Sequence, residues 1–341
     1  MEQEFLELVR IVSEMQQRMI SLEQANQVLV RSNQQLIACM EENQRELEDY
    51  QRNIFFEMNA SSPDKEGYWY PSIASVEETV AQIVKEGKSL ARFGDGEFST
   101  IAGRIRHRFQ NQTDDTLRER LIEVLQSKEE HLMIGLADNY GSLECYNEQA
   151  RREIRRYLSP QVRREHLQLL DSEKLYYNAY VTRPYAMYQD NRTDAPRKRF
   201  EALKKIWENR DCIFVEGCYT GLGVGNDLFD HAKSIGRILG PAENAFSSYG
   251  QLLEACIKQG KGRLFLLALG PAATVLAYDL ARAGCQAVDV GHVDLEYEWF
   301  LKGEGHRTAV SGKYNNEAEQ DQQLFPIQDE EYQSQIIADL S

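Results

Sequence analysis

Two carboxylates stand two positions apart directly after an apolar run. Gly94-Asp95-Gly96-Glu97 follows residues 89–93, and the glycines allow the backbone to come close to a ligand. Mg²⁺ and Mn²⁺ prefer carboxylate and phosphate oxygens, and a protein usually supplies only one or two of the carboxylates. Such a metal can bridge a diphosphate and neutralise a phosphate leaving group. Asp95 and Glu97 are therefore candidate ligands for Mn²⁺ or Mg²⁺, and a turn with two solvated acids is the alternative.

A second acidic segment lies within residues 286–301. Four carboxylates and one imidazole fall within ten positions after an apolar stretch: Asp289, His292, Asp294, Glu296 and Glu298. An imidazole can complete a metal shell that carboxylates begin, which makes His292 a third candidate ligand. Asp294 or Glu296 can act as the general base for an incoming hydroxyl. Each acid taken singly can instead cap a helix or face solvent.

Four glycines follow the apolar stretch 212–215 and lead into a predicted helix over residues 225–234. They are Gly217, Gly221, Gly223 and Gly225. Backbone amides freed of side chains can approach a phosphate at a helix N-terminus. A dinucleotide fingerprint needs a third glycine where Asn226 stands, so the match to it is weak. Glu216 with these glycines fits a methyltransferase equally well, and Asn226 and Asp227 can either cap the helix or bind a ribose or sugar hydroxyl.

Arginine and tyrosine gather in the middle of the chain. Arg183 lies in the tyrosine-rich stretch 176–188. A guanidinium binds phosphate, and aromatic rings stack on bases and sugars. Arg183 is thus a candidate ligand of a nucleotide sugar, with an aromatic core and one ion pair as the alternative. The six arginines between residues 151 and 164 are expected to form a solvated helix face.

Apolar strand signals alternate with helix signals from residue 75 onward. The predicted strands are 89–93, 131–136, 212–215, 237–239, 264–268 and 287–290. The predicted helices are 75–86, 116–126, 149–158, 163–170, 198–209, 225–234, 247–259 and 272–283. This alternation predicts an α/β fold with a mainly parallel, Rossmann-like sheet and helices on both faces. Ligands bind such sheets beyond the carboxyl ends of the strands, where Asp95, Gly217 and His292 all fall.

The first 58 residues carry one heptad pattern without proline or glycine. Counting alternately by three and four from Phe5 to Ile54, twelve of the fifteen seam positions are apolar. A repeat of about 3.5 residues predicts a left-handed coiled coil, and Asn26 and Asn33 at the a positions favour two parallel strands. We therefore expect a homodimer through residues 1–58, whose deletion should leave a folded, monomeric body. A lone helix folded against the body is the alternative.

Charge and cysteine content limit the partners and the compartment. The net charge is −15 and is concentrated at the two ends, so nucleic acid is not an expected partner. The six cysteines show neither paired nor zinc-ligand spacing, and we expect them reduced in a cytoplasmic protein. We expect neither a signal peptide nor a transmembrane segment. The predicted organisation is a coiled-coil helix (1–58), a linker (59–74), an α/β domain (75–315) and a disordered or loosely docked acidic tail (316–341).

Four blocks of the sequence together resemble a known family, the GT-D-fold glycosyltransferases, first catalogued as a bacterial domain of unknown function. The blocks are RFGDGEF (92–98), VEGCYTGLGVGNDLFDHAKSI (215–235), ILGPAENAFSSY (238–249) and LALGPAATVLAYDLARAGCQAVDVGHVDLEYEWFL (267–301). The resemblance extends over residues 75–315, the whole predicted α/β domain.

The resemblance implies a metal-dependent transfer from a nucleotide sugar, with a UDP-sugar as the leading donor, to a hydroxyl of a glycan or glycoprotein. It implies that Asp95 and Glu97 form a D-x-E element that holds Mn²⁺ or Mg²⁺ on the diphosphate. Two other functions stay open: a coiled-coil scaffold with a non-catalytic domain, and another nucleotide-dependent transferase such as a methyltransferase. The candidate ligands of the nucleotide sugar are Arg92, Gly94, Arg183, Glu216, Gly217, Gly223, Asn226 and Asp227.

Overall fold

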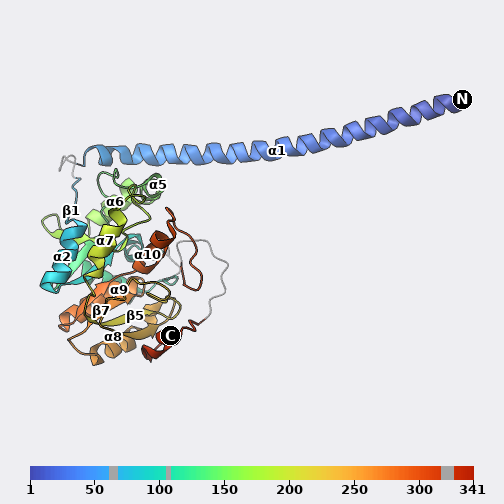
Figure 1. Ribbon diagram of the computed structural model, residues 1–341. Helices are drawn as coiled ribbons and strands as arrows, with labels where there is room; N and C mark the ends of the chain where they lie inside the picture. The colour runs from blue at the N-terminus through green and yellow to red at the C-terminus, as the bar shows by residue number, and fades with distance from the viewer. Residues whose placement is uncertain (61–67, 105–108, 316–325) are drawn as a thin grey trace. The chain divides into compact units, whose positions relative to one another are not determined.

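The computed structural model describes residues 1–60, 68–104, 109–315 and 326–341. These residues divide into two compact units, Met1–Ile54 and Phe55–Ser341. The first unit is helical almost from its first residue, because helix α1 runs without interruption over Glu2–Met58 (Figure 1). At about 1.5 Å per residue, a helix of this length extends for about 85 Å.

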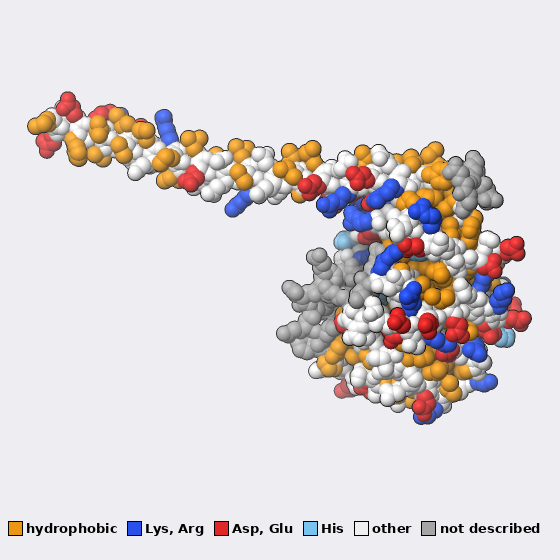
Figure 2. Space-filling model, turned by 180° about the vertical axis from the view of Figure 1, so that it is seen from behind, with side chains coloured by type: hydrophobic (Ala, Val, Ile, Leu, Met, Phe, Trp, Pro, Cys, Tyr) orange, Lys and Arg blue, Asp and Glu red, His pale blue; other side chains and the backbone are white. Residues whose placement is uncertain are grey.

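Apolar side chains lie exposed along α1. Figure 2 shows hydrophobic side chains spaced along the helix. The predicted helix is confirmed, and its pairing with a second copy stays a prediction. No helix in the described parts of the chain is both long and apolar enough to cross a lipid bilayer. The exposed seam residues are Phe5, Leu8, Val12, Met15, Met19, Leu22, Leu29, Leu36, Met40, Leu47 and Tyr50.

The second unit is built on one parallel sheet, and nine of its strands fall in the described residues, in the order β1-β4-β3-β2-β8-β7-β5-β6-β9. The predicted α/β fold is confirmed. All six predicted strands are present, as β2, β3, β5, β6, β7 and β8, whereas β1, β4 and β9 were not predicted. The bounds are β1 Ser72–Ile73, β2 Ser89–Phe93, β3 Leu132–Leu136, β4 Leu175–Asn178, β5 Asp211–Gly217, β6 Ser234–Gly240, β7 Leu264–Ala268, β8 Gln286–Asp289 and β9 Ile336–Asp339.

Helices cover both faces of the sheet, and the side chains of the strands alternate between them. In β2, Ala91 and Phe93 pack on one layer while Leu90 packs on the other. The first layer contains α3 (Asp95–Ile101), α4 (Asp115–Gln126), α8 (Tyr249–Lys258) and α9 (Pro271–Arg282). The second contains α2 (Val76–Glu86), α7 (Ala195–Lys204) and α10 (Val293–Lys302). The remaining helices are α5 (Glu148–Tyr157), α6 (Pro160–Leu167), α11 (Glu330–Ser334) and the short 3₁₀ helices η1 (Ala179–Thr182) and η2 (Ala245–Ser248).

Strands β2 and β8 are neighbours whose following helices leave to opposite faces. The chain passes from β2 into α3 in the first layer and from β8 into α10 in the second. Such a reversal is a topological switch point, and α/β sheets bind their ligands beyond the carboxyl ends of the strands at this place. The fold therefore directs attention to the residues that follow β2 and β8.

The helix predicted over residues 225–234 is absent, because this stretch forms a series of turns. Asn226 Nδ2 donates to Asp294 and Glu298 at 2.8 and 2.7 Å, and its Oδ1 accepts from the backbone N–H of Leu228. Side-chain bonds of this kind offer the backbone an alternative to a helix. The predicted helix is therefore wrong, and this stretch offers no helix N-terminus for a phosphate.

The predicted loosely docked tail is ordered over its described part. Strand β9 extends the sheet beside β6, and Arg237 N donates to Gln335 O at 2.7 Å. Helix α11 buries Tyr332, whose ring centre lies 4.4 Å from the guanidinium carbon of Arg237. These contacts make the segment from 329 onward part of the sheet domain. The part of the predicted tail at 316–325 lies outside the described residues.

The last turn of α1 belongs to the second unit. Arg155 donates to both carboxylate oxygens of Glu57 at 2.8 and 2.9 Å. Arg163 is fully buried, with its guanidinium carbon 4.5 Å from the ring centre of Phe56. The predicted solvated face is therefore wrong for these two arginines. The compact body accordingly begins inside the last turn of α1 and not after residue 58.

Candidate active site

Asp95 and Glu97 lie in the first turn of α3, directly beyond the carboxyl end of β2. Both are partly exposed, and Glu97 Oε2 accepts a hydrogen bond from the N–H of Gly94 at 2.8 Å. Burial raises the pKa of Glu97, the Gly94 N–H opposes the rise, and the charge of Asp289 adds to it. The positive end of a helix favours carboxylates in this turn. The two acids therefore lie together at the switch point, just beyond the carboxyl end of β2. We call this position the Asp95 corner.

These two acids suit a divalent metal by their chemistry. Both offer hard oxygen atoms, and a Mg²⁺ or Mn²⁺ site commonly takes one or two carboxylates because substrate phosphates and water complete it. Within the residues that the structure describes, no three His, Cys, Asp or Glu side chains gather as a metal site of their own. A metal at this corner would therefore depend on the phosphates of a bound nucleotide.

His292, the third predicted metal ligand, lies beside an arginine. Its Nδ1 is 3.2 Å from Arg183 Nη2, and its ring centre is 5.5 Å from that of Phe109. A guanidinium at this distance repels a metal ion and competes for the nitrogen lone pair. The geometry thus groups His292 with Arg183 beyond β8 and does not favour it as a ligand with Asp95 and Glu97.

Arg92 braces the two strands of the switch point. Its Nη2 lies 2.8 Å from Asp289 Oδ1, and its Nε donates to the carbonyl of Asp289 at 2.9 Å. Gly291 has φ +46°, and a Cβ atom there would lie 2.0 Å from Arg92 Nη2. Only glycine leaves room for this bridge. Arg92 was predicted as a ligand of the nucleotide sugar. In the structure its guanidinium instead binds Asp289 and holds β2 to β8.

The two acids predicted as general bases are buried in α10. Asp294 accepts from Gly223 N at 3.0 Å and lies 2.6 Å from Lys313 Nζ. Glu296 Oε2 accepts from the backbone N–H groups of Tyr185 and Ala186 at 3.0 and 2.8 Å. Their exposed fractions are 3% and 1%. Both carboxylates hold neighbouring segments in place, and an acceptor hydroxyl could reach neither without disrupting these contacts.

The glycine loop after β5 is shaped by a buried ion pair. Glu216 has no exposed surface, accepts from Leu222 N at 2.7 Å and pairs with Arg237. Burial raises the pKa of Glu216, and the positive charge of Arg237 opposes the rise. Gly223 has φ +78°, and a Cβ atom there would lie 2.6 Å from the ring of Phe229. Packing and backbone geometry therefore explain Glu216 and Gly223 without a phosphate.

The remaining predicted ligands of the loop are also engaged within the protein. A Cβ atom on Gly217 would lie 3.2 Å from Ala242 Cα. Asp227 accepts from the hydroxyl of Tyr297 at 2.7 Å and lies 3.3 Å from Lys204 Nζ. With no helix after this loop, the geometry that favoured a methyltransferase is missing as well.

Sequence reasoning included Tyr180 in the tyrosine-rich stretch 176–188 but missed Asn139 and Arg307. Burial raises the pKa of Tyr180, Asp95 raises it further, and Arg183 and Arg307 lower it, so all three charges lie around this phenol. Asn139 Nδ2 donates to the Tyr180 hydroxyl at 2.9 Å. Tyr180 therefore marks where the end of β4 meets the Asp95 corner. For Asn139 the local signal was its position just beyond a predicted strand, and for Tyr180 it was the run of tyrosines.

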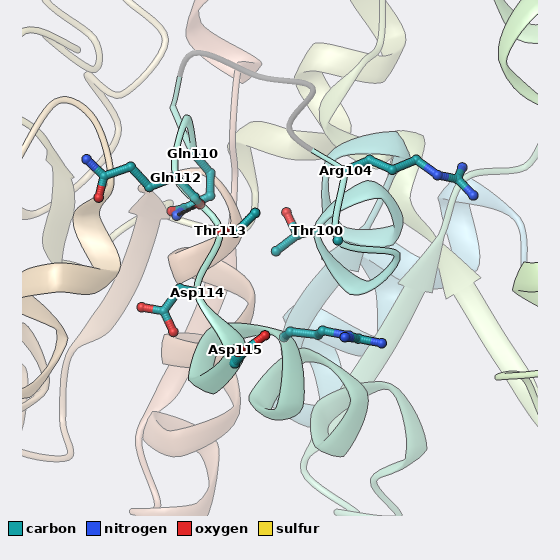
Figure 3. Close-up of a pocket in the computed structure, with 9 residues that line it drawn as sticks. Thr100, Arg104, Gln110, Gln112, Thr113, Asp114 and Asp115 are labelled. Atoms are coloured by element: carbon teal, nitrogen blue, oxygen red, sulfur yellow. Dashed lines mark hydrogen bonds between the residues drawn. The ribbon is translucent and has the colours of Figure 1, made fainter.

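An open pocket with about 290 Å³ of empty volume lies elsewhere, between the end of α3 and the start of α4 (Figure 3). Arg104 and Arg118 contribute to its lining, together with Asp114 and Asp115. Arg104 pairs with Glu165 on α6. None of the predicted site residues lines this pocket, so we do not assign the active site to it.

Comparison with known proteins shows which family the chain resembles. A family model described as "Glycosyltransferase GT-D fold" matches residues 90–318. "Probable glycosyl transferase Gly" of Streptococcus gordonii is 37% identical over 272 residues, which are 79% of this chain and 39% of that protein. "Glycosyltransferase GlyD" of Streptococcus pneumoniae serotype 4 is 36% identical over 312 residues, 90% of this chain and 36% of that protein. The chain thus spans well under half the length of both relatives.

Solved structures give the same answer for the fold. A structure described as "A New Glycosyltransferase (DUF1792) from Streptococcus sanguinis" superposes with a TM-score of 0.74 at 35% identity, covering 80% of this chain and all of that one. Another, described as "The highly conserved domain of unknown function 1792 has a distinct glycosyltransferase fold", has a TM-score of 0.73 at 33% identity over 80% of this chain and 96% of that one.

Proposed function

Because the chain belongs to the family of GT-D-fold glycosyltransferases, we propose that it transfers a sugar from a nucleotide sugar, with a UDP-sugar as donor, to a hydroxyl of a glycan or glycoprotein. The observation that carries the proposal is the pair Asp95 and Glu97 at the switch point of a parallel sheet. In sheets of this kind a nucleotide lies against the carboxyl ends of the strands.

Asp95 and Glu97 would hold Mn²⁺ or Mg²⁺. When bound, such an ion neutralises the charge that develops on a departing nucleoside diphosphate. Glu97 is positioned for this by the Gly94 N–H, which orients its carboxylate, and Arg92 keeps β2 and β8 together beneath the corner. Glu216, Gly217, Gly223, Asn226 and Asp227 contribute by shaping the loop after β5 and do not contact the donor directly.

Arginine side chains near this corner supply positive charge for the phosphates. Arg183 and Arg307 both lower the pKa of Tyr180, the phenol whose pKa Asp95 raises. Arg183 lies 3.8 Å from Glu296 and Arg307 lies 3.0 Å from Glu153, and their side chains are 22% and 27% exposed, so each retains surface that can face a ligand. A guanidinium suits phosphate because its fork of N–H donors matches two oxygens. We assign the diphosphate to the side of the corner where these arginines lie.

The test compares Asp95→Asn and Glu97→Gln with Asp115→Asn, a matched control in the first turn of α4. Calorimetry with UDP and Mn²⁺ should show heat of binding for the wild type and the control and none for the two site variants. Hydrolysis of UDP-sugars should be lost in the same two variants, with unchanged thermal unfolding. Hydrolysis that survives both substitutions in the presence of EDTA would reject the metal-dependent mechanism.

We further propose that α1 pairs with a second copy as a parallel coiled coil. The seam positions that are apolar in sequence are exposed along the helix, and burying them against an identical helix removes this apolar surface from water. Asn26 and Asn33 would face their counterparts at the a positions and fix the register. The cytoplasmic location remains a prediction from sequence.

A further inference from the structure

We infer that Asp138 is the general base that deprotonates the acceptor hydroxyl, and that the acceptor sugar lies over the carboxyl ends of β3 and β4. The inference rests on the proposed glycosyl transfer and adds the acceptor side to it. Asp138 takes the place of Asp294 and Glu296 as the candidate base, because their carboxylates accept hydrogen bonds from backbone N–H groups inside the protein.

The position of Asp138 follows from the register of the sheet. Strands β2 and β3 are parallel neighbours, and Phe93 at the end of one pairs with Leu136 at the end of the other. Asp95 and Asp138 each stand two positions beyond these paired residues. The segments that follow β2 and β3 therefore leave the same edge of the sheet side by side. One carries Asp95, the proposed metal ligand, and the other carries Asp138.

Asp138 differs from the other acids of this edge in its lack of a strong partner. It is exposed, and its carboxylate has one long contact, 3.4 Å from Asn178 Nδ2. Within the described residues no lysine or arginine lies within ion-pair distance of it. By contrast Asp289 pairs with Arg92, and Glu97 accepts from a backbone N–H. A base must keep a lone pair available to its substrate, and Asp138 does so.

The surroundings of Asp138 suit a sugar. Tyr146 donates to the Asp138 carbonyl, and the ring of Tyr146 lies 5.5 Å from that of Tyr188 and 5.8 Å from that of Tyr180. Tyr180 in turn accepts from Asn139. Aromatic faces and amide groups together bind the apolar faces and hydroxyls of carbohydrates. This cluster lies on the side of the Asp95 corner away from β8.

The protonation behaviour agrees with this role. Although the residue as a whole is exposed, partial desolvation of its carboxyl group raises the pKa of Asp138, and the hydrogen bond from the amide of Asn178 opposes the rise. The net rise brings the carboxylate closer to the range useful to a base at neutral pH. Asp138 acts electrostatically on Cys145, Tyr146 and Tyr188, and Arg199 acts on the first and last of these. The nearby Tyr180 is influenced in turn by Asp95, Arg183 and Arg307.

The proposed step balances as a single displacement. The acceptor oxygen forms a bond to the anomeric carbon as its proton passes to the Asp138 carboxylate. The bond from the anomeric carbon to the diphosphate oxygen breaks, and its electron pair stays with the diphosphate. Attack opposite the leaving group inverts the anomeric centre. In donor hydrolysis, water takes the place of the acceptor and loses its proton to the same group.

The experiment uses the full chain, Mn²⁺ and the UDP-sugar that the wild type hydrolyses fastest. We expect Asp138→Asn to lower turnover by about 10²- to 10⁴-fold, the usual contribution of a general base. Heat of UDP–Mn²⁺ binding should not change, whereas Asp95→Asn loses that heat. Glu173→Gln, an exposed acid at the amino end of β4, is the matched control and should keep full turnover.

Two further readouts separate a base from a structural role. The acidic limb of the pH–rate profile should disappear in Asp138→Asn, and Asp138→Glu should regain part of the turnover. Turnover of Asp138→Asn within about twofold of wild type would overturn the inference. So would a loss of UDP–Mn²⁺ heat in that variant, because it would assign Asp138 to donor binding while leaving the proposed transfer intact.

Discussion

His166 links the stability of the body to pH through a buried, neutral imidazole. Its ring stacks on Phe98 with 3.7 Å between ring centres, and its two nitrogens lie 2.8 and 3.2 Å from the hydroxyls of Tyr140 and Tyr157. Burial lowers the pKa of His166 from 6.5 to about 3, and the charge of Arg163 adds to the effect. The folded protein therefore keeps this ring uncharged.

The direction of the pH effect follows from proton uptake. The unfolded chain protonates this imidazole below pH 6.5, whereas the folded chain does so only near pH 3. The neutral ring therefore contributes its full stability above pH 6.5, the pKa of His166 in the unfolded chain. This contribution is lost as the pH falls toward about 3, its pKa in the folded protein. Linkage gives a loss of about 2 kcal/mol between about pH 7.5 and pH 5.

Urea unfolding of the wild type and of His166→Gln at these two pH values measures this loss. Glutamine retains a donor and an acceptor for the two tyrosine hydroxyls but does not titrate. Because all other groups titrate in both proteins, the wild type should lose about 2 kcal/mol more than the variant. Equal losses in the two proteins would refute the assignment of a neutral, buried His166.

Two other predictions concern the borders of the body and its glycine loop. Deleting residues 1–54 should leave a folded monomer in light scattering, whereas deleting 1–58 also removes Phe56 and Glu57 and should lower the unfolding temperature. A dimer that persists without residues 1–54 would contradict the coiled coil. Glu216→Gln should lower the free energy of unfolding in urea by about 3–5 kcal/mol, because a buried guanidinium loses its counter-charge. An unchanged urea midpoint would contradict that ion pair.

Much of the fold could be predicted because its signals are local. Five-residue apolar runs such as β2 and β7 are buried on both faces of a parallel sheet, which is the pattern that such strands require. Strand β9 carries no such signal, because the segment around it is acidic and rich in glutamine. Its pairing with β6 depends on Tyr332 and Arg237, which are 95 positions apart. Contacts between residues so far apart along the chain produce no repeating pattern of apolar residues from which they could be predicted.

The same distinction applies to the glycine loop. Its glycines and Asn226 predict a helix start by local rules, yet Asn226 bonds to Asp294 and Glu298 some seventy positions later. These tertiary bonds override the local preference. Gly223 needs its positive φ and its contact with Phe229, and neither requirement can be distinguished from phosphate binding in the sequence.

The acids around the strand ends show why residue type alone could not identify the base. Asp289, Asp294 and Glu216 are each paired with a cation from another part of the chain, so their negative charges are compensated within the protein. A diphosphate is itself an anion and would be repelled by these carboxylates if they were unpaired. Their compensation leaves Asp95 and Glu97 to attract a metal at the corner. Internal ion pairing of these three acids is therefore a condition for an acidic strand edge to accept an anionic donor.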